Sequence, residues 1–120
     1  MRTLIVDDEP LIRWSLGKAL AGRGCVISEA GDARAALDIA AQGGLDLILL
    51  DLKLPDSAEL SLLEQLRALV PTARIVVMTA FGTAATKARA LELGAAAVVD
   101  KPFVVKTVVS IALSGLKKSP

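Results

Sequence analysis

Short runs of apolar residues recur along the chain, separated by longer stretches whose apolar residues are spaced as on one face of a helix. The runs show little alternation of apolar and polar positions, so we expect buried strands that are covered on both faces. The second run turns polar and is expected at an edge of the sheet. The predicted strands are 3–7, 25–29, 46–50, 74–78 and about 96–99.

Each predicted strand is followed by a predicted helix. Pro10 can open the first helix, because the first helical turn needs no donor from it, and Asp32 can cap the second. Asp56 with Glu59 resembles a capping box for the third helix. The helices are expected from Pro10 to about Gly22, from Asp32 to about Gln42, from Asp56 to the residue before Pro71, over 83–93, and from Phe103 to about Leu116. Their predicted buried faces are Ile12, Leu16 and Leu20; Ala33, Ala36, Leu37 and Ala40; Leu62, Leu63, Leu66 and Val70; and Ala84, Ala88 and Leu91.

This alternation of strands and helices predicts an α/β fold: a doubly wound, five-stranded parallel sheet with helices on both faces. A chain of 120 residues supports one domain, which we expect over 1–116, with 117–120 as the start of a linker. In such sheets, ligands bind beyond the carboxyl ends of the strands, at the point where the strand order reverses.

Polar side chains stand at these carboxyl ends. Asp7 and Asp8 follow the first strand, Asp51 ends the third, Thr79 ends the fourth, and Lys101 follows the fifth. We interpret them as one site, with Asp51 as the reacting group.

At one sheet edge, Asp7, Asp8 and Asp51 are expected to lie close together, and neighbouring carboxylates raise one another's pKa unless a cation joins them. A ligand set of oxygens without His or Cys suits Mg²⁺, with Mn²⁺ as a substitute. A cation, an ammonium and a hydroxyl around one carboxylate are what a phosphoryl group requires.

Each of these residues alone also has an ordinary structural interpretation: a turn or cap for the aspartates, a solvated side chain for Lys101, and a backbone-bonded hydroxyl for Thr79. Their conjunction at one sheet edge favours the site. We assign other nearby charges to structure: Glu9 at the start of a helix, the solvated Lys53 side chain, Asp56 and Asp100.

Composition narrows the function classes further. Histidine is absent, which excludes histidine-based catalysis and His-ligated metal sites within this chain, so any phosphohistidine belongs to a partner. The net charge of +1 gives no electrostatic reason for nucleic acid binding. Cys25 is expected in the core. We find no signal peptide and no apolar run long enough for a membrane span, and expect a cytoplasmic protein.

Four sequence segments, in order along the whole chain, resemble the receiver domain of two-component response regulators: VDDEP at 6–10, LDLKLPD at 50–56, VMTAFGT at 77–83 and KPF at 101–103. The resemblance implies a flavodoxin-like (CheY-like) fold with strand order 2-1-3-4-5. It also implies that Asp51 is the phosphoacceptor of a sensor histidine kinase.

By the same resemblance, Asp8 and Asp51 would bind Mg²⁺ directly and Asp7 largely through water. The backbone carbonyl of Lys53 would complete the protein ligands, and Thr79 and Lys101 would bind phosphoryl oxygens. The Lys101–Pro102 peptide would be cis.

The segments IRW at 12–14 and TAFGT at 79–83 look most like regulators that activate sigma-54-dependent transcription. The implied function is a phosphorylation-activated switch that controls transcription and is not an enzyme. DNA contact would come from a domain outside this chain. The alternative is a stand-alone receiver or phosphorelay protein without DNA-binding output.

Two other function classes fit the sequence less well than a receiver domain does. Phosphatases of the haloacid-dehalogenase type need a second Asp two residues after the nucleophile, where Lys53 stands. A degenerate receiver, acting as a constitutive interaction module, would not be expected to keep Asp7, Asp8, Asp51, Thr79 and Lys101.

The sequence departs from the family pattern in the relay away from the site. Ser57-Ala58-Glu59 replaces a loop that usually ends in glycine, and Val98 stands where Tyr or Phe is usual. The last helix spreads apolar residues over more than one face. We predict that a homodimer forms through 83–116; a loosely amphipathic terminal helix is the equally weighted alternative.

Overall fold

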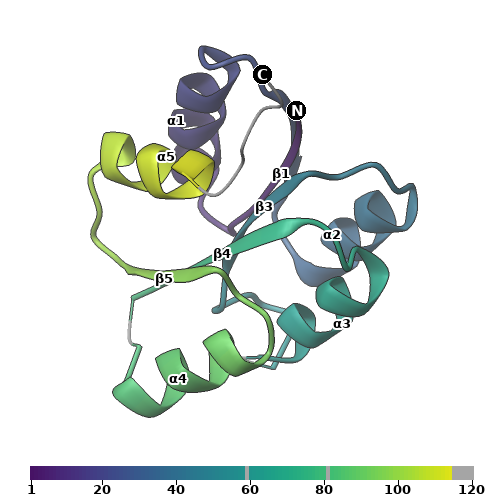
Figure 1. Cartoon of the computed structure of the whole chain (residues 1–120), viewed down its shortest axis with the longest axis vertical. Helices are drawn as coiled ribbons and strands as arrows, with labels where there is room; N and C mark the ends of the chain where they lie inside the picture. The colour runs from purple at the N-terminus through teal and green to yellow at the C-terminus, as the bar shows by residue number, and fades with distance from the viewer. Residues whose placement is uncertain (59, 81, 115–120) are drawn as a thin grey trace.

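The protein folds around a parallel sheet with the strand order β2-β1-β3-β4-β5 (Figure 1). The structure, a computed structural model, describes residues 1–58, 60–80 and 82–114. Its elements are β1 (Arg2–Val6), α1 (Pro10–Ala21), β2 (Val26–Ala30), α2 (Ala33–Ala41), β3 (Leu47–Asp51), α3 (Ser61–Leu69), β4 (Arg74–Thr79), α4 (Ala84–Glu92), β5 (Ala97–Asp100) and α5 (Val105–Ser114). The predicted fold class and strand order are confirmed.

The strands lack polar alternation because both faces of the sheet are covered. Successive residues of a strand point to opposite faces, and in β1 Leu4 and Val6 enter one core while Ile5 enters the other. The first core packs against α2, α3 and Ala90 of α4, and the second against α1 and α5. Figure 1 shows α1 and α5 together on one side of the sheet and α2 and α3 on the other.

The capping box predicted for α3 is wrong. The residue at the N-terminal boundary of α3 is Leu60, with no side-chain cap, and α3 begins only at Ser61. The carboxylate of Asp56 instead accepts hydrogen bonds from the backbone N–H groups of Ala33 and Arg34 in α2. Glu59 lies outside the described residues, as does the predicted domain boundary at 116/117.

The buried face predicted for α4 is also wrong. Ala84, Ala88 and Leu91 are exposed, and the buried residue is Ala90. Alanine occurs on several sides of this helix, so its periodicity does not single out one face, and the position of α4 against β5 decides.

The remaining differences are small. Cys25 is buried as expected and precedes β2, which starts at Val26. The last helix begins at Val105, two positions later than predicted. Among the described helices, none has the length and apolar character that crossing a membrane requires.

Candidate functional site

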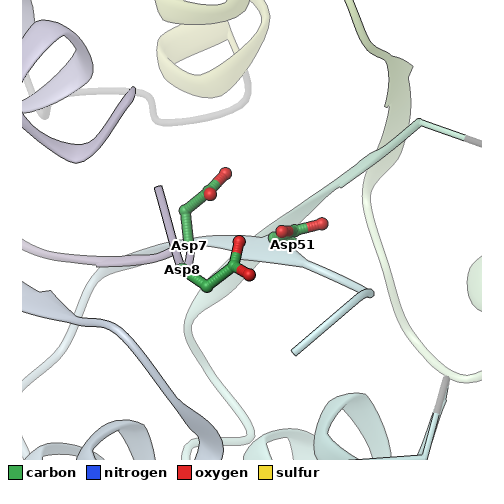
Figure 2. A group of neighbouring side chains, drawn as sticks. All are labelled: Asp7, Asp8 and Asp51. Carbon is green, nitrogen blue, oxygen red and sulfur yellow. The ribbon is translucent and has the colours of Figure 1, made fainter. Parts of the chain in front are cut away.

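Three carboxylates gather where β1 and β3 end side by side (Figure 2). The strand order reverses between these two strands, which is where a doubly wound sheet opens a crevice. One oxygen each of Asp7, Asp8 and Asp51 can be chosen so that all lie within 4.8 Å of one another. Asp7 is fully buried, Asp51 is 4% exposed, and Asp8 faces solvent. The predicted acidic cluster is therefore assembled.

Lys101, which directly follows the edge strand β5, enters the same cluster. Its ammonium nitrogen Nζ lies 2.7 Å from Oδ2 of Asp7 and 3.4 Å from Oδ2 of Asp51. Glu9 is at 3.8 Å from the same nitrogen. Glu9, which stands at the start of α1 as expected, thus also contributes negative charge at the rim of the site. The Lys101–Pro102 peptide is cis, as expected.

Backbone donors orient the two buried carboxylates. The N–H of Glu9 donates to Oδ1 of Asp7 at 2.9 Å, and the N–H of Lys53 donates to Oδ1 of Asp51 at 3.2 Å. Both bonds close tight turns just beyond a strand, a common role for aspartate. They leave the second oxygen of each carboxylate facing Lys101.

Burial and neighbouring charges shift two pKa values here. Burial raises the pKa of Asp51 above its ordinary value of 3.8, and Asp7 adds to the rise; the Lys53 N–H and Lys101 oppose it without cancelling it. Burial alone would lower the pKa of Lys101, but the hydrogen bond to Asp7 and the charge of Asp51 outweigh it and raise that pKa above 10.5. At neutral pH, Lys101 is therefore charged.

Thr79 ends β4 next to this cluster and is 6% exposed. Its carbonyl accepts a 2.8 Å hydrogen bond from the N–H of Lys101, which couples the two predicted phosphoryl-binding residues through the backbone. Gly82 lies close against Thr79: a Cβ added to Gly82 would lie 2.6 Å from the Thr79 methyl group.

Sequence analysis missed one residue that supports the site. Arg13 of α1 donates from Nη1 to the carbonyl of Asp7 at 2.7 Å, and its Nε donates to Glu29 of β2 at 3.1 Å. It therefore fixes the peptide that joins two of the clustered aspartates. A bond to a main-chain carbonyl leaves no pattern in the sequence, so nothing there could have identified it.

Oxygen ligands alone converge here, the donor set that divalent ions such as Mg²⁺ and Ca²⁺ prefer. The cluster thus fits a hard divalent cation. The buried Asp51 carboxylate, with Lys101 beside it, is also suited to carry a phosphoryl group whose oxygens need positive charge.

Comparison with known proteins agrees with this geometry. The family model described as "Response regulator receiver domain" matches residues 3–112. NtrC, a DNA-binding transcriptional regulator of Azospirillum brasilense, is 37% identical over 90% of this chain, and the match spans 22% of NtrC. Sporulation initiation phosphotransferase F of Bacillus subtilis is 33% identical over 85% of this chain and 82% of its own length.

A solved structure has a similar fold. A response regulator from Burkholderia pseudomallei, crystallised with a phosphorylated aspartic acid and a calcium ion, superimposes with a TM-score of 0.85. It is 31% identical, and the match covers 92% of this chain and 65% of that one.

The chain spans only about a fifth of its NtrC relative, so the family assignment concerns the domain and not the whole of that protein. On the family match over residues 3–112, the chain belongs to the response regulator receiver domains, the phosphoacceptor switches that sensor histidine kinases phosphorylate in two-component systems.

Proposed function

We propose that Asp51 is the phosphoacceptor of this receiver. The observation that carries the proposal is its position: a buried carboxylate at the end of β3, 3.4 Å from the Lys101 ammonium and clustered with Asp7 and Asp8. The phosphorylated aspartic acid of the Burkholderia pseudomallei relative supports the same chemistry.

Mg²⁺ is the proposed cofactor, with Mn²⁺ as its substitute. Asp8 and Asp51 would bind the ion directly, Asp7 would act largely through water, and the Lys53 carbonyl would complete the protein ligands. Asp7 suits the indirect role because one of its oxygens accepts from Glu9 and the other from Lys101. When bound, the ion supplies positive charge to the oxygens of the transferring phosphoryl group.

The phosphoryl donor is a phosphohistidine of a sensor kinase. A carboxylate oxygen of Asp51 attacks phosphorus, the phosphorus–nitrogen bond breaks, and the electron pair returns to the imidazole of the partner. A cavity of about 610 Å³ opens beside Lys101, between the start of α1 and the start of α5. This chain contributes position and charge to the transfer.

The aspartyl phosphate changes what Lys101 and Thr79 can bind. It adds roughly one negative charge and new acceptor oxygens. Nearly complete reversal of a two-state population takes about 5.5 kcal/mol, and hydrogen bonds to charged groups contribute about 1.5–3 kcal/mol each. Bonds from the Lys101 ammonium, the Thr79 hydroxyl and nearby backbone N–H groups are therefore sufficient in principle.

The readout is proposed to be a homodimer through 83–116. Leu91 on α4 and Val104 before α5 are 50% and 67% exposed, so both offer apolar surface to a partner within this segment. In the same segment, Lys87 and Asp100 form a 2.7 Å ion pair that ties α4 to the end of β5, directly before Lys101. If Lys101 moves toward a phosphoryl group, the adjacent Asp100 moves with it, and its ion pair with Lys87 transmits the movement to α4 at the surface.

The output that best fits is control of sigma-54-dependent transcription, with DNA bound by a domain outside this chain, as the NtrC relative suggests. A phosphorelay role without DNA-binding output is the alternative, as the similarity to sporulation initiation phosphotransferase F suggests. The residues encoded after Pro120 decide between them: an ATPase domain with a helix-turn-helix supports the first, and a stop codon supports the second.

Beryllofluoride, which mimics a phosphoryl group on aspartate, tests the site. We expect saturable, Mg²⁺-dependent amide shifts at Asp51, Thr79 and Lys101 by NMR, and an increase in the mass of the particle by light scattering. Substituting Leu91→Ser with Val104→Ser should suppress the second effect and leave the first intact. Absence of any beryllofluoride binding by the wild type would contradict the proposal and favour a constitutive interaction module.

A further inference from the structure

Asp56 connects two elements that are distant in sequence. It lies in the loop after β3, and its carboxylate reaches the start of α2. Oδ1 accepts from the N–H of Ala33 at 2.7 Å, and Oδ2 accepts from the N–H of Arg34 at 3.2 Å. These are the first two residues of the helix, whose N–H groups have no partner within it.

The helix has a cap of its own besides this bond. Asp32 accepts from the N–H of Ala35 at 2.8 Å, as the sequence predicts. Two carboxylates from different elements thus share the N-terminus of α2, and they do so at different donors. The donors of Ala33 and Arg34 lower the pKa of Asp56 below 3.8, so this carboxylate is ionised at neutral pH. The Asp56 bond therefore ties α2 to the loop as well as capping the helix.

The loop in question carries the backbone next to Asp51. Leu52 and Leu54 are 4% and 7% exposed and pack into the core beneath α2 and α3. Lys53 lies between these two anchors, with its side chain exposed and its N–H on Asp51. Past Leu54, the next hydrophobic residue of the described chain that packs against this core is Leu60, directly before α3, and α3 has no side-chain cap. Within this interval, the hydrogen bonds of Asp56 to α2 hold the loop in place.

We propose that Asp56 is a positioning residue for the cation site: by fastening the loop after β3 to the start of α2, it holds the backbone of Lys53 beside Asp51. The inference rests on the proposed function, because it takes the Lys53 carbonyl as a ligand of the ion. The loop that departs from the family pattern is thus tethered to an adjacent helix, α2, by a carboxylate of its own.

The competing explanation is that Asp56 only stabilises α2. Asp32→Ala is the matched control, because it also removes one negative charge and one carboxylate that caps α2, but it leaves the loop untouched. Asp56→Asn is the matched rescue: it loses the charge as Asp56→Ala does, but keeps an oxygen that can accept from Ala33. Thermal unfolding of all three variants without metal measures the purely structural effect.

The affinity for Mn²⁺, measured by the paramagnetic resonance of the free ion, is the first functional readout. We expect Asp56→Ala to weaken binding about tenfold, near the lower end for residues that orient metal ligands, and Asp32→Ala to change it less than about twofold. Asp56→Asn should recover most of the loss. Equal affinities for the Asp56→Ala and Asp32→Ala variants would overturn the proposal.

A readout without metal separates this inference from the proposed function. In the metal-free protein, Asp56→Ala should shift the amide of Lys53 and speed its hydrogen exchange, whereas Asp32→Ala should leave both unchanged. If the wild type binds no Mn²⁺, the proposed cation site is wrong. If loss of Asp56 leaves the Lys53 amide unchanged, the proposed positioning role of Asp56 is wrong, irrespective of the Mn²⁺ affinity.

Discussion

Replacing Asp51 by asparagine should stabilise the metal-free protein, although it removes the group on which phosphorylation is proposed to occur. Asparagine is nearly isosteric, and its side-chain oxygen can still accept the 3.2 Å hydrogen bond from Lys53. The main change is therefore the loss of one negative charge from a cluster that already holds Asp7 and Asp8.

The distances give the size of the effect. At an effective dielectric constant of about 20, two charges at 4.8 Å interact by about 3.5 kcal/mol, so the two neighbouring carboxylates repel Asp51 by about 7 kcal/mol. Lys101 at 3.4 Å attracts it by about 5 kcal/mol. Screening at the exposed Asp8 weakens the repulsion. Burial of Asp51 adds a desolvation cost, which destabilises the charged wild-type protein as the repulsion does. We expect a gain of about 2 kcal/mol, or about 8 °C in Tm for 120 residues.

The difference should depend on pH with a definite sign. Because the folded state raises the pKa of Asp51 above 3.8, ionisation of this group costs stability. The cost is absent well below 3.8, grows as the pH rises through the raised pKa, and is complete above it. The stabilities of wild type and variant should therefore converge in acid and separate toward neutral pH.

Urea and thermal unfolding in EDTA measure the effect, with Asp38→Asn as the control, an exposed aspartate of α2 outside the cluster. Added Mg²⁺ should stabilise the wild type by mass action and the variant much less, which narrows the gap. The electrostatic reasoning is refuted if the Asp51→Asn protein in EDTA at neutral pH is no more stable than the wild type.

Three further substitutions probe the surroundings of Asp51. Lys101→Met leaves the fully buried Asp7 without its cation and should cost about 3 kcal/mol in urea unfolding; a loss below about 1 kcal/mol would mean that solvent already compensates this charge. Arg13→Met should cost about 1–2 kcal/mol and weaken Mn²⁺ binding, because the Asp7 carbonyl loses its donor; unchanged Mn²⁺ affinity would contradict a role at the site. Gly82→Ala forces the chain away from Thr79 and should weaken beryllofluoride binding with little change in Mn²⁺ affinity; equal beryllofluoride binding would show that Thr79 tolerates the shift.

The sequence was sufficient to predict the sheet because each signal there is local. Apolar runs without alternation mark strands covered on both faces, and glycines or prolines mark where helices stop. The five polar residues of the candidate site follow from the same interpretation, since the carboxyl ends of the four parallel strands that carry them share one edge. Lys101 and Asp7 are 94 positions apart and still meet at 2.7 Å.

What the sequence could not provide is the choice between local and distant partners. Asp56 fits a capping box with Glu59, yet the donors it binds lie 23 and 22 positions upstream. The hydrogen bond from Arg13 to the Asp7 carbonyl likewise has no recognisable pattern in the sequence. For α4, alanines on several faces leave the helix without a hydrophobic stripe, so packing alone decides that Ala90 is buried and Leu91 is exposed.

Covalent labelling of the intact protein tests the central claim most directly. The protein is incubated with acetyl phosphate and Mg²⁺, the acyl phosphate is trapped with borohydride, and the modified peptide is mapped by mass spectrometry. The account predicts modification at Asp51 alone, dependent on Mg²⁺ and absent from the Asp51→Asn variant, whose fold is kept. Modification of another residue, or labelling of the Asp51→Asn variant to the extent of the wild type, would contradict it.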